Sequence, residues 1–140
     1  MTMQMATLAD RRAWGELTTV FTSTVRADWS ALSGVAAAAI PAADLIAGWR
    51  AGLTATQHLL ANQDVTVRGD HATAAAYVHA AHRLASTFAD DVWIVASSYT
   101  YDLVRTGDGW RIAAVAFHPA WGRGNQQIMT AAATDARHGA

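Results

Sequence analysis

The sequence predicts a single α+β domain in which helices come first and an antiparallel sheet follows. Helical periodicity dominates roughly the first 50 residues, and alternating runs rich in Val, Ile, Tyr and Trp dominate most of the rest. The segment Thr106-Gly107-Asp108-Gly109 is a strong hairpin signal between the last two strands. Helices followed by hairpin-linked strands are typical of α+β domains, and 140 residues fit one such domain.

The composition excludes several classes of function. Hydrophobic residues make up 52% of the chain, which allows a sizeable core. The formal net charge is -1 without a basic block, which argues against a nucleic-acid or anionic membrane partner. The chain has no cysteine, so disulfides and thiolate metal sites are ruled out. No apolar run reaches the roughly 20 residues that span a bilayer, and we expect a cytoplasmic protein.

The first helix is expected over residues 5–22. At about 100° per residue its apolar stripe contains Met3, Ala6, Ala13, Trp14, Leu17, Val20 and Phe21. Asp10 lies near the centre of this stripe, so its carboxylate is expected to point inward, which is costly unless it is paired or lines a wet cavity. The alternative is a carboxylate near the helix start that the helix dipole or Arg12 stabilises.

The remaining elements are predicted from the hydrophobic periodicity and from the positions of proline and glycine. We expect a short strand over residues 25–29 and a helix over residues 41–53 that starts at Pro41. Four longer strands are expected over residues 56–67, 71–86, 91–105 and 110–118, and a terminal helix over residues 125–137. His118 precedes Pro119 and is expected to end a strand, or to lie at a pocket mouth.

His58 is the first candidate among the histidines. In a strand it shares one face with Thr56, Leu60, Asn62 and Asp64. A strand histidine is more often a core or surface residue, but a nearby carboxylate gives it a mechanism. Such a carboxylate fixes the imidazole tautomer and stabilises the imidazolium that forms when the ring takes a proton.

His82 is the second candidate. It shares a strand face with several alanines, which leave room for a ligand or mark close packing of a helix. His79 lies on the opposite face, and a one-residue bulge would exchange the two histidines.

Four further residues are candidates for substrate binding. Trp29 and Trp14 are expected to form pocket walls. Asp28 is either a site residue or a solvated strand-end residue. Tyr101 shares a face with Tyr99, and a phenol there could donate to a substrate carbonyl or could be a half-buried sheet aromatic. No histidine spacing fits a metal motif and no glycine-rich phosphate loop is present, so neither a metal nor a cofactor is expected.

Several segments, in this order, resemble the SnoaL-like branch of the nuclear transport factor 2-like (NTF2-like) superfamily. They are Leu8-Ala9-Asp10-Arg11-Arg12-Ala13-Trp14, Asp28-Trp29, Thr56-Gln57-His58-Leu59-Leu60, Tyr77-Val78-His79-Ala80-Ala81-His82 and Gly107-Asp108-Gly109-Trp110-Arg111-Ile112. The resemblance covers the chain up to about residue 118. It implies a cone-shaped, cystatin-like fold in which N-terminal helices pack in a strongly curved antiparallel sheet around an internal pocket. It also implies a homo-oligomer, a dimer or a trimer, through outer sheet faces.

Within this superfamily the site pattern is similar to that of scytalone dehydratase-type members. Asp10 matches their helix aspartate, and His58 and His82 match their two strand histidines. Ala9 and Trp29 stand where those members have tyrosines, so the resemblance does not choose the reaction.

The function that we expect is a cofactor-independent lyase or isomerase acting on a small, largely apolar carbonyl compound. His58, oriented by Asp10, would remove a proton next to the carbonyl, and His82 would donate to a leaving hydroxyl or to the enolate oxygen. Dehydration, isomerisation and cyclisation all begin with that step. The alternatives are a non-catalytic small-molecule binding domain and a structural subunit like the small subunits of ring-hydroxylating dioxygenases.

Overall fold

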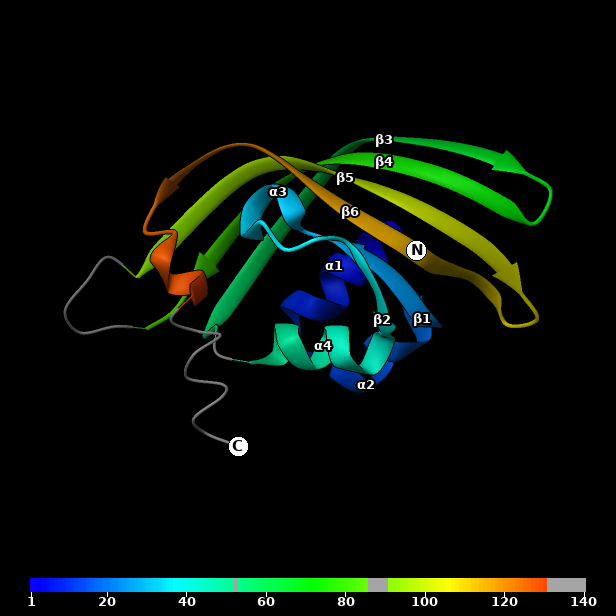
Figure 1. The fold of residues 1–140 in the computed structure, drawn as a ribbon, viewed down its shortest axis with the longest axis horizontal. Helices are drawn as coiled ribbons and strands as arrows, with labels where there is room; N and C mark the ends of the chain where they lie inside the picture. The colour runs from blue at the N-terminus through cyan, green and yellow to red at the C-terminus, as the bar shows by residue number, and fades with distance from the viewer. Residues whose placement is uncertain (52, 86–90, 131–140) are drawn as a thin grey trace.

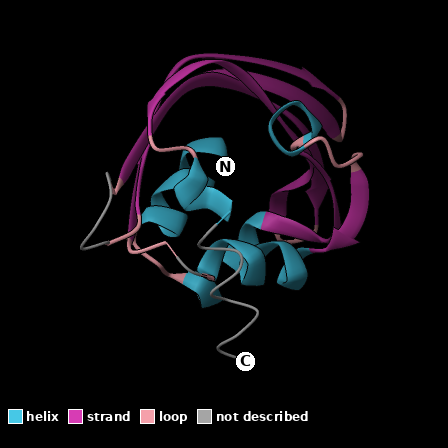
Figure 2. Ribbon diagram, turned by 60° about the vertical axis from the view of Figure 1, so that its left-hand side comes forward, coloured by secondary structure: helices cyan, strands magenta, loops and turns pink. Residues whose placement is uncertain are grey.

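A strongly curved sheet of six strands wraps around helices from the first half of the chain (Figures 1 and 2). The computed structural model describes residues 1–51, 53–85 and 91–130. In chain order the elements are α1 (Thr2–Asp10), α2 (Trp14–Leu17), the 3-10 helix η1 (Thr18–Val20), β1 (Phe21–Asp28), α3 (Ser30–Ser33), β2 (Ala38–Pro41), α4 (Ala42–Arg50), β3 (Ala55–Arg68), β4 (His71–Arg83), β5 (Val92–Thr106) and β6 (Gly109–Gly124).

The strands follow the order β2-β1-β6-β5-β4-β3, so the sheet is open at both edges. Four of the five pairings are antiparallel, and β3 to β6 form a continuous meander. The pairing of β1 with β6 is parallel, which corrects the expectation of a fully antiparallel sheet. Parallel neighbours need a long crossover, and here most of the chain lies between the two strands. The predicted α+β class with helices inside a curved sheet is confirmed.

The predicted continuous helix over residues 5–22 is wrong. Helix α1 ends at Asp10, and Arg12 adopts a left-handed backbone with φ 57°. The amide of Ala13 then donates to the carbonyl of Leu8 at 2.9 Å and that of Arg12 to Ala9 at 3.0 Å, the pattern of a Schellman motif. The predicted apolar stripe combined residues on both sides of this reversal, and Met3, one of its members, is 59% exposed.

Several other predicted boundaries also change. Strand β1 begins at Phe21 and ends at Asp28, so Trp29 lies outside it, and neither α3 nor β2 was predicted. Strand β6 continues past His118 to Gly124, so His118 does not end a strand. Its register shifts between the pairs Ser97↔Pro119 and Ala96↔Trp121, and such a bulge accommodates the proline. Residues 127–130 are helical; positions 131–137 of the predicted terminal helix, and residue 86 of the second long strand, lie outside the described residues.

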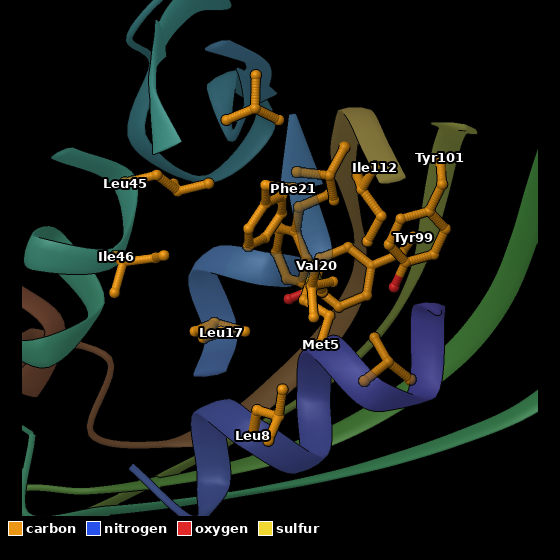
Figure 3. Close-up of a cluster of buried hydrophobic side chains, with 14 of the residues drawn as sticks. Met5, Leu8, Leu17, Val20, Phe21, Leu45, Ile46, Tyr99, Tyr101 and Ile112 are labelled. Atoms are coloured by element: carbon orange, nitrogen blue, oxygen red, sulfur yellow. The ribbon is translucent and has the colours of Figure 1, made fainter. Parts of the chain in front are cut away.

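The core fills the space between the helices and the concave face of the sheet. Leu17, Val20 and Ile112 are 0% exposed. Burying a side chain of this size contributes about 1.5–3 kcal/mol. Figure 3 shows how these residues meet apolar side chains of the neighbouring helices and strands, which are Met5, Leu8, Phe21, Leu45, Ile46, Tyr99 and Tyr101. This packing fixes the position of α1 against the sheet.

The end of β6 gives a test of the sheet geometry. Gly124 has φ 92°, and a Cβ there would collide with the backbone carbonyl of Val92. We expect Gly124→Ala to lower the free energy of unfolding by about 1–3 kcal/mol, measured by urea denaturation. Gly107→Ala is the control, because Gly107 has nothing within 4 Å of its Cβ position and no left-handed φ. Equal stability of the two variants would contradict the described pairing of β5 with the end of β6.

Candidate functional site

A cavity of about 160 Å³ lies beside this core on the concave side of the sheet. Its walls come from α1, the turn after it, α4, the three strands β3 to β5 and the helical segment 127–130. Most of the lining is apolar: Met5, Ala6, Ala9, Trp14, Trp29, Gly48, Trp49, Ala51, Leu53 and Met129. The polar lining is Arg12, Thr56, His58, His82 and Tyr99. A volume of this order holds about one six-membered ring.

His58 lines this cavity, and Asp10, which is not itself a lining residue, hydrogen-bonds to it. The Nδ1 of His58 lies 2.7 Å from Oδ1 of Asp10, and the backbone N–H of His58 donates to Oδ2 at 2.7 Å. The hydroxyl of Thr56 also donates to Oδ1, at 2.9 Å. Both side chains are mostly buried, with 14% of His58 and 20% of Asp10 exposed. The last residue of α1 is thereby joined to β3 by three hydrogen bonds.

These contacts determine the charge of Asp10 and the tautomer of the neutral His58 ring. Burial alone would raise the pKa of Asp10, but the hydrogen bonds from the side chain and backbone of His58 and from Thr56 bring it below its ordinary value of 3.8. An ionised carboxylate can only accept hydrogen bonds, so Nδ1 of His58 must donate. The neutral ring therefore carries its proton on Nδ1 and keeps a lone pair on Nε2.

The alternative explanation of Asp10 by the helix dipole is wrong. Asp10 is the last residue of α1 and not one of its first, and the C-terminal end of a helix disfavours a negative charge. No ion pair joins Asp10 to Arg12 in the described part of the chain. The three donors from β3 compensate for both the dipole and the burial.

His82 lies on the same inner surface as His58. Along β4 buried and more exposed positions alternate without a bulge, so His82 is 9% exposed while His79 faces outward. The rings of His58 and His82 are 5.7 Å apart at 85°, and His82 stacks on Trp93 at 5.1 Å. Burial, and after it the proximity of His58, lowers the pKa of His82 from 6.5 to about 4. His82 is therefore neutral at physiological pH.

The Nδ1 of His82 is buried without a hydrogen-bond partner among the described residues. The interaction with the backbone of Trp93 raises the pKa of His82 and so offsets part of the effect of burial. It does not give Nδ1 a hydrogen-bond partner.

Aromatic rings form the inner wall of the cavity. Trp29 packs against Trp49 at 5.9 Å, Tyr99 at 6.2 Å and Phe117 at 6.5 Å. Burial, and then the charge of Asp10, raises the pKa of Tyr99, so its phenol stays protonated. Trp14 lines the cavity from α2, with the Arg12 guanidinium 5.4 Å from its ring centre.

The structure does not bring Asp28 and Tyr101 to the cavity. Asp28 accepts hydrogen bonds from the hydroxyl and the backbone N–H of Ser30, at 2.6 and 3.0 Å, which lower its pKa and hold the start of α3. Tyr101 is a core residue, 2% exposed. His118 is exposed and hydrogen-bonds Thr100 at 3.0 Å.

Several lining residues were missed from the sequence. Thr56 shares the strand face of His58, so the same period-2 argument could have found it. Arg12, Trp49 and Met129 carry no such local signal, because their place at the cavity depends on how α1 ends and how α4 and segment 127–130 pack. In residues 1–51, 53–85 and 91–130 no group of three His, Asp or Glu side chains could hold a metal ion.

Comparisons with known proteins agree with this architecture. A solved structure of the Kfla4162 protein from Kribbella flavida has a TM-score of 0.84 and 30% identity, over 89% of this chain and 88% of that one. A candidate scytalone dehydratase from Novosphingobium aromaticivorans has a TM-score of 0.74 and 15% identity, over 87% and 80% of the two chains. The hexachlorocyclohexane dehydrochlorinase LinA-type3 from Novosphingobium barchaimii has a TM-score of 0.69 and 16% identity, over 87% and 83%.

The last two likenesses concern the fold alone, because their sequence identities are low. No curated protein matches the sequence. In the part of the chain that the structure describes, no helix has the length and apolar character to cross a bilayer. The sequence model of the SnoaL-like domain matches residues 2–116. The chain therefore belongs to the family of SnoaL-like domains.

Proposed function

We propose that the protein is a cofactor-independent lyase or isomerase in which His58 removes a proton next to the carbonyl of a small, largely apolar substrate. The observation that carries this proposal is the 2.7 Å hydrogen bond between Asp10 and Nδ1 of His58 at the cavity wall. A histidine whose Nδ1–H donates a hydrogen bond to a carboxylate keeps a lone pair on Nε2. This is the tautomer that a general base needs.

Asp10 has two roles in this proposal. Its carboxylate fixes the ring orientation of His58, and its negative charge stabilises the imidazolium that forms when Nε2 takes the proton. Both effects are strengthened because the pair is mostly buried, where charges are screened less than in water. Thr56 holds Oδ1 of the carboxylate in place, as a positioning residue.

His82 supports the transition state as a neutral group. With its ring centre 5.7 Å from that of His58, a cationic His82 would oppose the formation of the His58 imidazolium. The depressed pKa of about 4 avoids this repulsion. In the tautomer with the proton on Nε2, the ring donates a hydrogen bond to the developing enolate oxygen or to the leaving group.

The walls and the solved relatives support the substrate class and a lyase. Trp14, Trp29 and Tyr99 line a space of ring size, which favours an apolar or aromatic body. The names of two structural relatives, a candidate scytalone dehydratase and a hexachlorocyclohexane dehydrochlorinase, both describe eliminations. Elimination is one of the outcomes open to a proton abstraction in this cavity.

A second candidate, a structural or oligomeric role for the sheet, has one observation in its favour. The outward face of β3 and β4 carries Leu59 and Tyr77, 59% and 63% exposed. Val65 and Val67 are also more than half exposed, but they follow the bulge of β3 and pair with Ala74 and Ala72 on the opposite face. Exposed apolar residues of this size mark interaction surfaces when they gather. The open cavity favours the catalytic proposal over a purely structural subunit, and a dimer or trimer through this face stays a prediction.

Proton abstraction can be measured before the final product is known. Native mass spectrometry of the purified protein identifies the retained carbonyl compound, and NMR in D₂O then follows exchange of the proton next to its carbonyl. We expect wild-type protein to catalyse this exchange and His58→Ala to lower the rate by about 10²–10⁴-fold, the usual contribution of a general base. Asp10→Asn should also lose most of the rate, because an amide no longer fixes the productive tautomer.

His79→Ala is the matched control for this experiment, since His79 faces outward on the strand that carries His82. Its exchange rate should equal that of the wild type. Exchange that survives in His58→Ala would disprove the assignment of His58 as the base.

The neutral state of His82 predicts a pH-dependent stability. In the unfolded chain this ring takes a proton near pH 6.5, whereas in the folded protein its pKa is about 4. Acidification from pH 6.5 to about 4 therefore favours the unfolded state, by up to about 3 kcal/mol from this group. We expect His82→Phe, which keeps a ring beside Trp93, to reduce the loss of unfolding free energy between pH 7 and pH 4.5 in urea denaturation.

The control is His79→Phe, which makes the same substitution at an exposed histidine of the same strand. If His82→Phe and the wild type lost the same free energy on acidification, His82 would not be held neutral by burial.

A further inference from the structure

Arg12 stands where the cavity opens to solvent. It lines the cavity and is at the same time an exposed residue. Among the described lining residues it is the single Lys, Arg, Asp or Glu, so it supplies the permanent charge of the cavity wall. The mechanism proposed above does not use it.

The backbone at this position favours glycine, not arginine. Arg12 is the residue after the helix cap in the Schellman motif that ends α1, with φ 57°. A left-handed backbone is unfavourable for a residue with a Cβ, and such strain concentrates at ligand-binding and active sites. An arginine side chain therefore stands at a position where the backbone conformation favours glycine.

The guanidinium is oriented but not neutralised. Its Nη1 donates to the carbonyl of Leu53 at 2.9 Å and lies 3.4 Å from that of Thr54. The group also lies 5.4 Å from the centre of the Trp14 ring. None of the ion pairs found in the described chain includes Arg12, and the nearby carboxylate of Asp10 is occupied by three donors from β3. Its Nη2 and Nε remain for another partner.

We propose that Arg12 binds a carboxylate of the substrate, so that the substrate class is a small acid with a ring-sized apolar body. The apolar body would occupy the space beside Trp29 and Tyr99, and the carboxylate would meet the guanidinium at the opening. The planar guanidinium matches the two oxygens of a carboxylate. A single cation also fits one negative charge better than a phosphate dianion, for which the described lining offers no second Lys or Arg. This inference rests on the proposed function, because it names the substrate class of the same site.

The test compares phenylacetate with phenylacetamide, an acid and a neutral amide of nearly equal shape. Isothermal titration calorimetry at neutral pH and low salt measures both affinities for four proteins. In the wild type the acid should bind at least about tenfold more tightly than the amide. Arg12→Gly, which suits the left-handed backbone, should bring the ratio of affinities near one. Arg12→Lys should keep part of the preference, and Arg11→Ala, which removes the adjacent arginine that does not line the cavity, should keep all of it.

Two outcomes would overturn the inference. One is wild-type protein that does not bind the acid more tightly than the amide. The other is Arg12→Gly that retains the wild-type preference. If the preference for the acid depends on Arg12 but exchange activity survives in His58→Ala, the proposed base is refuted and the carboxylate site is not. If exchange activity is lost in His58→Ala but the preference does not depend on Arg12, only the carboxylate site is refuted.

Discussion

The hydrogen-bonded contact between Asp10 and β3 is the constraint on which the site depends. A carboxylate at the C-terminal end of a helix, mostly buried, is stable only when donors replace its lost water. Strand β3 provides three of them, from Thr56 and from the side chain and backbone of His58. The same contacts that stabilise the charge also select the tautomer of His58, so the requirement of the fold and the requirement of the proposed chemistry coincide.

The cavity exists because small side chains lie where the core ends. Large residues such as Leu17 and Ile112 fill the space between the helices and the middle of the sheet. Beyond them α1 presents Ala6 and Ala9, and α4 presents Gly48, to the cavity. Aromatic rings on the other side are too rigid to collapse into the space, which leaves an apolar chamber with polar groups on one wall.

Local periodicity predicted the parts of the site that depend on local geometry. The inward direction of His58 and His82 follows from the alternation of side chains along a strand. The stripe that predicted an inward Asp10 combined residues on both sides of the break at Arg12, so the direction of Asp10 depends instead on its hydrogen bonds to β3. The end of α1 could not be predicted, because Arg12 takes a backbone conformation that sequences usually mark with glycine. The parallel pairing of β1 with β6, and the bulge that carries β6 past Pro119, arise from contacts between distant segments.

The tautomer of His58 is the most direct test of this account, because the orientation of the base follows from it. The ¹⁵N NMR spectrum of protein labelled at its histidine rings, with His58 assigned from the spectrum of His58→Ala, reports which ring nitrogen carries the proton. For the neutral His58 ring the account predicts a proton on Nδ1, and a loss of that selection in Asp10→Asn. A neutral His58 with its proton on Nε2, or a spectrum that Asp10→Asn leaves unchanged, would contradict it.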